Sequence, residues 1–377
     1  MVRGDDLAQC NTHSVPSPRA AASTYDRAMR ILIIGGTGLI SSAFARECDA
    51  RGDELTLITR GSHGSAGAPA SAKVIHADAT DADALRTALH GARLRRERWD
   101  AVVQFVAFAP QQVAEDVVTF APLTDRYVLI ATSAAYATFE RFQPLTEDTT
   151  LENTEWTYAS DKIACEDVLR KDAPAAGLDF TIVRPAHTYG DSKIPAFTGN
   201  SSHPWTIVDR MRRGADIVIP GDGTALWTVT HASDVASGIR GLLDTDASRG
   251  LAVHVVSNEA LTWTGLYRAI AHAAGLTDAQ FETQVVHVPA DALIAATPSQ
   301  AGSIRGDKMH CAVYDTSLLR SLVPGWEAQT SFAVGVRNTI EAFEAHPEWQ
   351  TIDDDANAMF DRIAAIYRRA LLDSAQD

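Results

Sequence analysis

The sequence has no long apolar run, few cysteines and a shortage of positive charge, and each shortage excludes a class of protein. No apolar stretch approaches the roughly 20 residues of a membrane-spanning helix. The four cysteines among 377 residues lie far apart without a metal or redox motif, which indicates reduced thiols and a cytoplasmic location. Lys and Arg number 33 against 48 Asp and Glu, and the net charge of −15 argues against nucleic acid or an anionic membrane as the main partner.

The first 28 residues differ in composition from the rest of the chain. They lack apolar periodicity and are rich in Ala, Ser, Pro and Asp. They contain no hydrophobic segment of the kind that a secretory signal needs. We expect residues 1–28 to be a disordered tail, or translation to begin at Met29, which lies just before the first apolar run.

A short strand, a glycine turn and a helix follow from Ile31 onward. The apolar run 31–34 predicts a buried strand, and the spacing Gly35-x-x-Gly38-x-x-Ser41 comes directly after it. Such a turn lets the phosphates of a dinucleotide approach the backbone and a helix N-terminus. Ser41 stands where a third glycine is common, and an ordinary strand–turn–helix is the alternative. The candidate cofactor contacts in this stretch are Gly35, Thr37, Gly38, Leu39 and Ile40.

Strands and helical patterns alternate after this turn. Strands are predicted at 54–59, 73–76, 99–108 and 127–132, with helical segments between them. This alternation predicts an α/β fold with a Rossmann-like, doubly wound parallel sheet.

Residues at the ends of these strands are further candidates for the cofactor site. The second strand ends at Arg60 without the acid that accepts the ribose 2′-hydroxyl of NAD, so charge favours NADP over NAD. Arg60 stacking on adenine or facing solvent is the alternative. Asp78 and Ala79 follow the third strand near the expected adenine edge, and Ala107 lies near the carboxyl end of the fourth.

The segment 157–170 predicts a helix with a chemically useful pair of side chains. Tyr158 and Lys162 are four residues apart and therefore share one helix face. A free tyrosine, with a pKa of about 10, is a poor base at neutral pH. A nearby ammonium group favours the phenolate and brings it toward the operating range. An exposed helix pair without function is the alternative.

Taken together, these pieces resemble the short-chain dehydrogenase/reductase superfamily, in its extended or atypical NAD(P)-dependent epimerase/dehydratase family. The resemblance covers most of the chain, from about residue 30 to residue 340. It is carried by the glycine turn at 35–38, Asp78, Thr132-Ser133 with Tyr136, Tyr158 with Lys162, Arg184-Pro185, Gly221-Asp222-Gly223 and His231-Ala232-Ser233-Asp234.

The resemblance implies a role for each matched residue. Tyr158 would be the acid/base, and Lys162 would bind the nicotinamide ribose and lower the pKa of the tyrosine. Thr132 would orient the substrate oxygen, with Ser133 as the adjacent alternative, and Pro185 would contact the cofactor. The resemblance also implies a homodimer, formed through helices that include 157–170.

At two positions the sequence departs from the family's pattern, and each departure makes one of the family's reactions or substrates less expected. Sugar-nucleotide 4,6-dehydratases of the family carry an Asp-Glu pair directly after the threonine, whereas this chain has Ser133-Ala134, so that dehydration is not expected. Members that bind nucleoside-diphosphate sugars carry an arginine four residues before the histidine of the His-x-x-Asp segment, and here the position is Trp227. Either another base substitutes, or the substrate is not a typical sugar nucleotide. The candidate bases are Arg210, Arg212 and Arg213.

Four residues are candidates for contact with a small-molecule substrate: His187, Trp205, Trp227 and Arg212. The two tryptophans stack on a sugar or base face in one interpretation and are core aromatics in the other. His187 follows Arg184-Pro185-Ala186, where it is either a second acid/base or a hydrogen-bonded structural histidine. No metal ion is expected.

The same reasoning divides the chain. We expect an NAD(P)-binding domain with the catalytic helix over 29–190, a substrate lobe interleaved with returning sheet elements over 191–345, and a helical segment over 346–377. Within the lobe, 303–315 is expected to be a loop with a short strand.

Three functions fit these patterns. The first is an epimerase that oxidises a secondary alcohol of a sugar, sugar nucleotide or sugar-like substrate to a transient ketone and reduces it again. The second is an NADP(H)-dependent ketone reductase or alcohol dehydrogenase, favoured by the missing acid after the second strand. The third is a dinucleotide- or RNA-binding regulator without catalysis, which the intact Thr132, Tyr158 and Lys162 set and the acidic charge disfavour.

Overall fold

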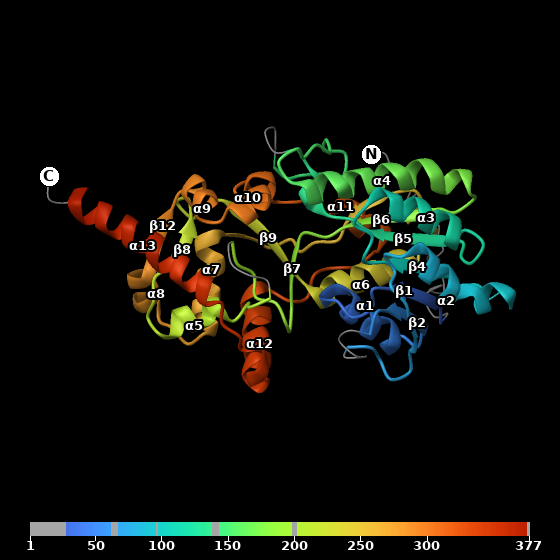
Figure 1. Ribbon diagram of the computed structural model, residues 1–377, viewed down its shortest axis with the longest axis horizontal. Coiled ribbons are helices and arrows are strands. Elements are labelled where there is room, and N and C mark those ends of the chain that lie inside the picture. Colours follow the sequence, from blue (N-terminus) through green and yellow to red (C-terminus); the bar gives the residue numbers. More distant parts are fainter. Residues whose placement is uncertain (1–27, 62–66, 96, 138–142, 198–201, 375–377) are drawn as a thin grey trace, which may run out of the picture.

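The protein has two halves with a seam between them (Figure 1). A computed structural model describes residues 28–61, 67–95, 97–137, 143–197 and 202–374. The expectation for residues 1–28 therefore lies outside the described residues, apart from position 28. Among the helices within those ranges, none is long and apolar enough to cross a membrane.

The first half is built on a seven-stranded sheet in which every pairing is parallel. The strand order is β10-β6-β5-β4-β1-β2-β3. This is the predicted doubly wound sheet, and its order reverses between β1 and β4, where ligands bind at the carboxyl ends of strands. The strands are β1 (Arg30–Ile34), β2 (Glu54–Thr59), β3 (Lys73–His76), β4 (Ala101–Gln104), β5 (Arg126–Ile130), β6 (Asp179–Arg184) and β10 (Ala252–His254).

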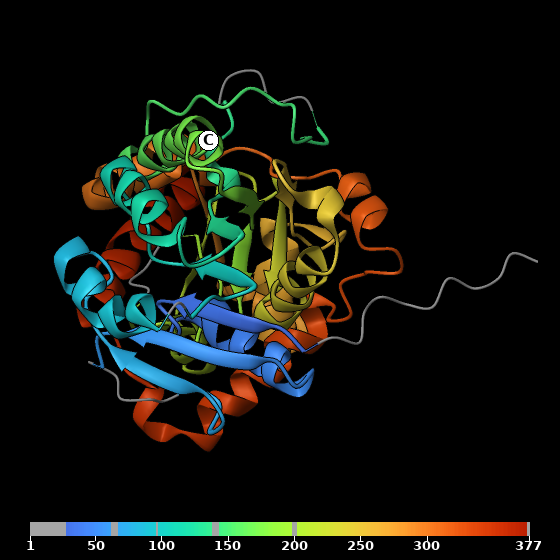
Figure 2. The same cartoon turned by 90° about the vertical axis from the view of Figure 1, so that its right-hand side faces the viewer.

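Helices cover both faces of this sheet because alternate side chains of β1 are apolar in both directions. Ile31 and Ile33 pack with one set of helices, and Leu32 and Ile34 pack with the other. Figure 2 shows helices on the two sides of the strands. The first set is α1 (Leu39–Ala50), α6 (Ala232–Leu243) and α11 (Ser317–Leu322), and the second is α2 (Ala82–Leu94), α3 (Pro110–Phe120) and α4 (Thr157–Ala175).

The second half has its own apolar core around two small sheets. One sheet has the order β11-β9-β7 and the other pairs β12 with β8. The strands are β7 (His187–Tyr189), β8 (Ile217–Pro220), β9 (Leu226–His231), β11 (Ala260–Thr262) and β12 (Val285–Val288). The helices are α5 (Thr206–Arg212), α7 (Trp263–Ala273), α8 (Asp278–Gln284), α9 (Ala290–Ala296), α12 (Phe332–Ala345) and α13 (Asp354–Ser374).

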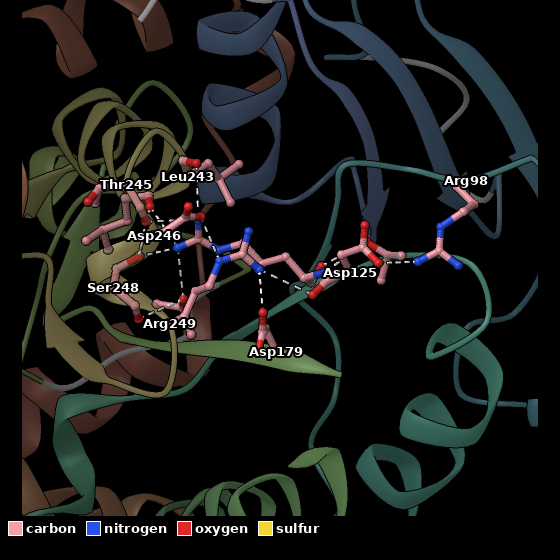
Figure 3. Close-up of polar contacts among 12 residues, drawn as sticks. Arg98, Asp125, Asp179, Leu243, Thr245, Asp246, Ser248 and Arg249 are labelled. Carbon is pink, nitrogen blue, oxygen red and sulfur yellow. Dashed lines mark hydrogen bonds and ion pairs between the residues drawn. The ribbon is translucent and has the colours of Figure 1, made fainter. Parts of the chain in front are cut away.

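A buried arginine fastens the C-terminal end of α6 to the sheet. The guanidinium of Arg126, on β5, donates to the carbonyl oxygens of Leu242 at 2.8 Å and Leu243 at 3.1 Å. The end of a helix leaves such carbonyls without intrahelical partners. Arg126 also donates to the hydroxyl of Ser248, beside the ion pairs of Arg249 (Figure 3). Burial lowers the pKa of Arg126 to about 10.

The segment 303–315 differs from the predicted loop with a short strand. Helix α10 (Ala301–Ser303) is followed by a π-helical turn, Ile304–Lys308, and later residues form only isolated bridges. Contacts from far along the chain hold the turn. Asn153 donates to the Gly306 carbonyl at 2.6 Å, and a Cβ on Gly306 would lie 2.8 Å from the Cβ of Trp156. The prediction was wrong because these contacts leave no local pattern.

Candidate active site

A cavity of about 1410 Å³ lies along the seam between the two halves. Its wall includes residues from the glycine turn, the ends of β5 and β6, the start of α4, the π-helical turn and the first turn of α13. The sequence-predicted residues that the structure brings together in this wall are Gly35, Gly38, Leu39, Ile40, Thr132, Ser133, Tyr158, Lys162, Pro185 and His187.

Ser41 organises the glycine turn. Its buried hydroxyl donates to the Gly35 carbonyl at 2.6 Å and accepts from the Gly38 N–H at 2.9 Å. Gly35 has φ +82°, and a Cβ there would lie 2.4 Å from Val106 Cγ1, so only glycine fits. Gly38 is exposed, lines the cavity and precedes the first turn of α1. Because Gly38 has no side chain, a phosphate group can approach the first turn of α1 there.

Tyr158 lies at the start of α4 beside Thr132, which follows β5. Burial raises the pKa of the Tyr158 phenol, a hydrogen bond with Thr132 opposes that rise, and the carboxylate of Asp307 adds to it. The Thr132 hydroxyl accepts from the Ala134 N–H at 3.2 Å, which leaves its proton available to donate. Ser133 is held by the Tyr314 hydroxyl, which donates to Ser133 Oγ at 2.9 Å.

Lys162 is fixed one helical turn after Tyr158. Its ammonium group donates to the carbonyl oxygens of Ala107 at 2.7 Å and Ile130 at 2.8 Å. These bonds leave one ammonium N–H for a ligand. Burial lowers the pKa of Lys162 to about 8, so the group carries its charge at neutral pH. Its Nζ also lies 4.8 Å from the ring centroid of Phe108.

Six charged residues that the sequence reasoning missed line the same cavity: Asp353, Asp354 and Asp355 around the start of α13, and a further three, Lys193, Asp307 and Lys308. Lys193 follows β7, and the other two lie on the π-helical turn. His187 lines the wall near them, and its Nε2 atom is buried without a hydrogen-bond partner among the described residues. The position of Lys193 just beyond a strand end was a usable signal, whereas Asp307 and Lys308 had none in the local sequence.

The remaining cofactor candidates lie outside the cavity wall. Arg60 is exposed at the end of β2, close enough to Asp78 for its charge to lower the pKa of that carboxyl, after the larger effect of hydrogen bonds from Thr80. Thr37 donates its N–H to the Gly35 carbonyl at 3.0 Å. Ala79 is partly buried beyond β3, and Ala107 is buried and acts on the site through its carbonyl bond to Lys162.

The structure does not place Trp205, Trp227 or Arg212 in the cavity wall. Trp227 is buried, donates to the His310 carbonyl at 3.0 Å and packs on Trp263 in the core. Trp205 is buried and stacked on Phe343. These aromatic faces are covered by neighbours, so they have no surface left for a sugar. Arg212 lies over Trp205 and forms an ion pair with Glu344 at 2.5 Å.

No group of three or more His, Cys, Asp or Glu side chains within the described ranges is arranged to hold a metal ion. The residues present do fit a nicotinamide dinucleotide. The glycine turn and the first turn of α1 suit its phosphates. Lys162 and Tyr158 line the cavity where its reactive end would lie.

The sheet order, the glycine turn and the Thr132, Tyr158 and Lys162 set define a Rossmann-type, NAD(P)-dependent oxidoreductase. Residues 31–255 match the NAD dependent epimerase/dehydratase family, and the chain belongs to that family. This match confirms the resemblance on which the sequence-based expectations rested.

Two curated proteins and one solved structure are similar to this chain. The chain is 27% identical to 2'-dehydrokanamycin reductase of Streptomyces kanamyceticus, over 79% of this chain and 80% of that protein. It is 23% identical to a chloroplast stem-loop binding protein of Arabidopsis thaliana, over 68% and 65% of the two chains. UDP-glucose 4-epimerase of Thermotoga maritima superposes with a TM-score of 0.66 at 18% identity, covering 84% of this chain and 99% of that one.

Proposed function

We propose that the protein reduces a ketone, or oxidises the corresponding secondary alcohol, on a sugar-like substrate with NADP(H). The proposal rests on one observation: Thr132, Tyr158 and Lys162 line the same cavity as the glycine turn. A reductase is among the relatives, with matched coverage of about four fifths of both chains. A nicotinamide cofactor, when bound, supplies or accepts the hydride.

The chain's own residues handle the proton. The Tyr158 phenol lies against Thr132, and its raised pKa keeps it protonated at neutral pH. A protonated phenol is the state that donates to a developing alkoxide, so the site suits ketone reduction. The Thr132 hydroxyl is hydrogen-bonded beside the phenol and lines the cavity, while Tyr314 fixes Ser133. Lys162 is held rigidly by two carbonyl groups.

The preference for NADP rests on Arg60. Its exposed side chain ends β2, and its charge acts on Asp78 at the end of the neighbouring strand. An arginine there attracts a 2′-phosphate, whereas an acid would repel it.

An epimerase on a sugar or sugar nucleotide is the second candidate, because the family description and the fold-related UDP-glucose 4-epimerase point to it. The two candidates differ in what becomes of the cofactor. An epimerase returns its hydride to the substrate and keeps its nucleotide, whereas a reductase must exchange the nucleotide at every turnover.

The deciding experiment is to denature the purified protein and identify the released nucleotide by mass spectrometry and absorbance. We expect little retained nucleotide and reversible binding of NADPH in a subsequent titration. Stoichiometric, tightly held oxidised cofactor would replace the reductase by the epimerase. Protein that binds neither nicotinamide dinucleotide would contradict both.

We also propose a homodimer in the cytoplasm. Helices α3 and α4 lie together on one face of the sheet, and Val118 on α3 is 70% exposed. Cys48 and Cys165 are buried free thiols. Light scattering of the purified protein should give twice the chain mass, and the chain mass alone would contradict the dimer.

A further inference from the structure

Two lysines on the substrate side of the cavity have no ion pair among the described residues, although the carboxylates of Asp307, Asp353, Asp354 and Asp355 line the same wall. Lys193 and Lys308 both line the wall, together with His187. Lys308 Nζ donates to the Phe197 carbonyl at 2.7 Å, and it has no ion pair among the described residues. Lys193 Nζ has neither a hydrogen bond nor an ion pair within the same ranges.

The two lysines lie close enough together to act on each other and on His187. Burial, and then the charges of Lys193 and Lys308, hold the pKa of His187 well below its usual range. Burial lowers the pKa of Lys308 to about 8, Asp307 opposes that shift and Lys193 adds to it. A carboxylate or phosphate between the two ammonium groups would relieve this repulsion.

The other basic residues considered for an anion are already neutralised. Arg210 forms an ion pair with Asp361 at 2.6 Å, and Arg213 forms one with Asp209 at 2.9 Å. Arg212 is paired with Glu344, as described above. Lys193 and Lys308 differ from these three arginines because neither lysine has an ion pair among the described residues, and both line the cavity.

The location of the lysines relative to Tyr158 limits what they bind. Lys308 directly follows Asp307 on the π-helical turn, and Asp307 is near enough to Tyr158 for its charge to act on the phenol. Lys308 and Tyr158 line the same cavity, so an anionic group held by Lys308 would share that cavity with the reacting oxygen. The buried Nε2 of His187 is a further polar atom that such a ligand would satisfy after a small movement of the ring.

We propose that Lys193 and Lys308 form an anion subsite, and that the substrate is an acidic sugar whose carboxylate or phosphate lies close to the carbon that reacts at Tyr158. This inference rests on the proposed function and names its substrate class.

The test is calorimetric binding of three probes to the full-length protein with NADP⁺ present: glucuronate, glucose 6-phosphate and neutral glucose. At least one acidic probe should bind about tenfold or more tightly than glucose, because hydrogen bonds to charged groups are the strong ones. Preference for glucuronate identifies a sugar acid, and preference for glucose 6-phosphate identifies a sugar phosphate.

Variants assign that preference to the lysines. Lys193→Met and Lys308→Met should each reduce it about tenfold, and Lys308→Arg should keep most of it. Lys171→Met, at an exposed position on α4 away from the cavity, is the matched control and should bind as the wild type does. Unchanged NADP⁺ binding in each variant shows that the fold is intact.

Two results would overturn the inference: acidic probes that bind no better than glucose, or a preference that survives in both methionine variants. Because these measurements need no turnover, they are independent of the proposed reaction. Activity that persists in Tyr158→Phe would reject the reaction, while the anion preference would stand or fall on the binding data.

Discussion

The two sides of the cavity treat buried charge in opposite ways. On the cofactor side, Lys162 is bonded to two carbonyl groups, and outside the cavity wall Arg184 on β6 forms a bidentate pair with Glu166 at 2.7 and 2.9 Å. On the substrate side, Lys193 has no partner in the described part of the chain. Charged side chains with protein partners hold the geometry of a site before a ligand binds. A charged side chain in a cavity without such a partner favours a ligand that carries the opposite charge.

The strongest test of the comparison is at Tyr158, where the two sides meet. Tyr158→Phe removes the hydroxyl and keeps the ring that packs on Trp156. We expect kcat to fall by about 10²–10⁴, because a positioned acid/base contributes about that much. Cofactor affinity, measured by fluorescence titration, should stay near the wild-type value. Lost cofactor binding together with retained turnover would reject the role given to Tyr158.

The next largest effect is expected from the arginine that fastens α6. Arg126→Met leaves the carbonyl groups of Leu242 and Leu243 without their donor, so the free energy of unfolding should fall by about 3 kcal/mol. Urea denaturation measures the change. Arg249→Met is the matched control, because its ion pairs are partly exposed and should be worth less than about 1 kcal/mol. Equal losses in the two variants would contradict the special role of Arg126.

Cofactor affinity should depend on pH through Lys162. The pKa of this lysine is lowered to about 8, so its charge is present below that pH and is lost as pH rises through it. We expect the dissociation constant of NADP(H) to rise up to about tenfold between pH 7 and pH 9. In Lys162→Met the affinity should be weaker at neutral pH and the dependence should flatten. A wild-type curve that is flat over this range would show that the charge is not used.

The smallest effect is expected at Arg60, an exposed charge on the cofactor side. Arg60→Ala should raise the KM for NADPH up to about fivefold and leave the KM for NADH nearly unchanged, as expected for a solvent-screened ion pair. The ratio of the two KM values is the measurement. An equal change for both cofactors would remove the charge argument for NADP.

The sequence predicted the cofactor side far better than the substrate side. The bounds of β2 and β3 agree with the predicted 54–59 and 73–76, since short β-rich runs between turns are local signals. Tyr158 and Lys162 share a helix, and their spacing is also local. The glycine turn was found for the same reason, although the part that Ser41 has in it depends on side-chain bonds that spacing alone does not show.

The substrate side depends on contacts between distant segments. Lys193 and Lys308 are brought together by the fold, and the π-helical turn that presents Lys308 is held by Asn153. Trp227 illustrates the converse difficulty. The sequence alone does not show whether a tryptophan at this position stacks on a sugar or packs in the core. In the structure, Trp227 packs on Trp263. Burial decides between these outcomes, and burial is a property of the whole fold.

The strand order of the large sheet has a consequence for how the molecule comes apart. The chain leaves the first half after β6, returns for α6 and β10, leaves again for β11, and returns once more for α11 before α12. The chain thus passes several times between the two halves. Cleavage of a single connection would not release a fragment that contains all the elements of one half. Without residues 252–254 the sheet would lose its edge strand beside β6. We therefore expect limited proteolysis to yield nicked protein whose pieces stay associated.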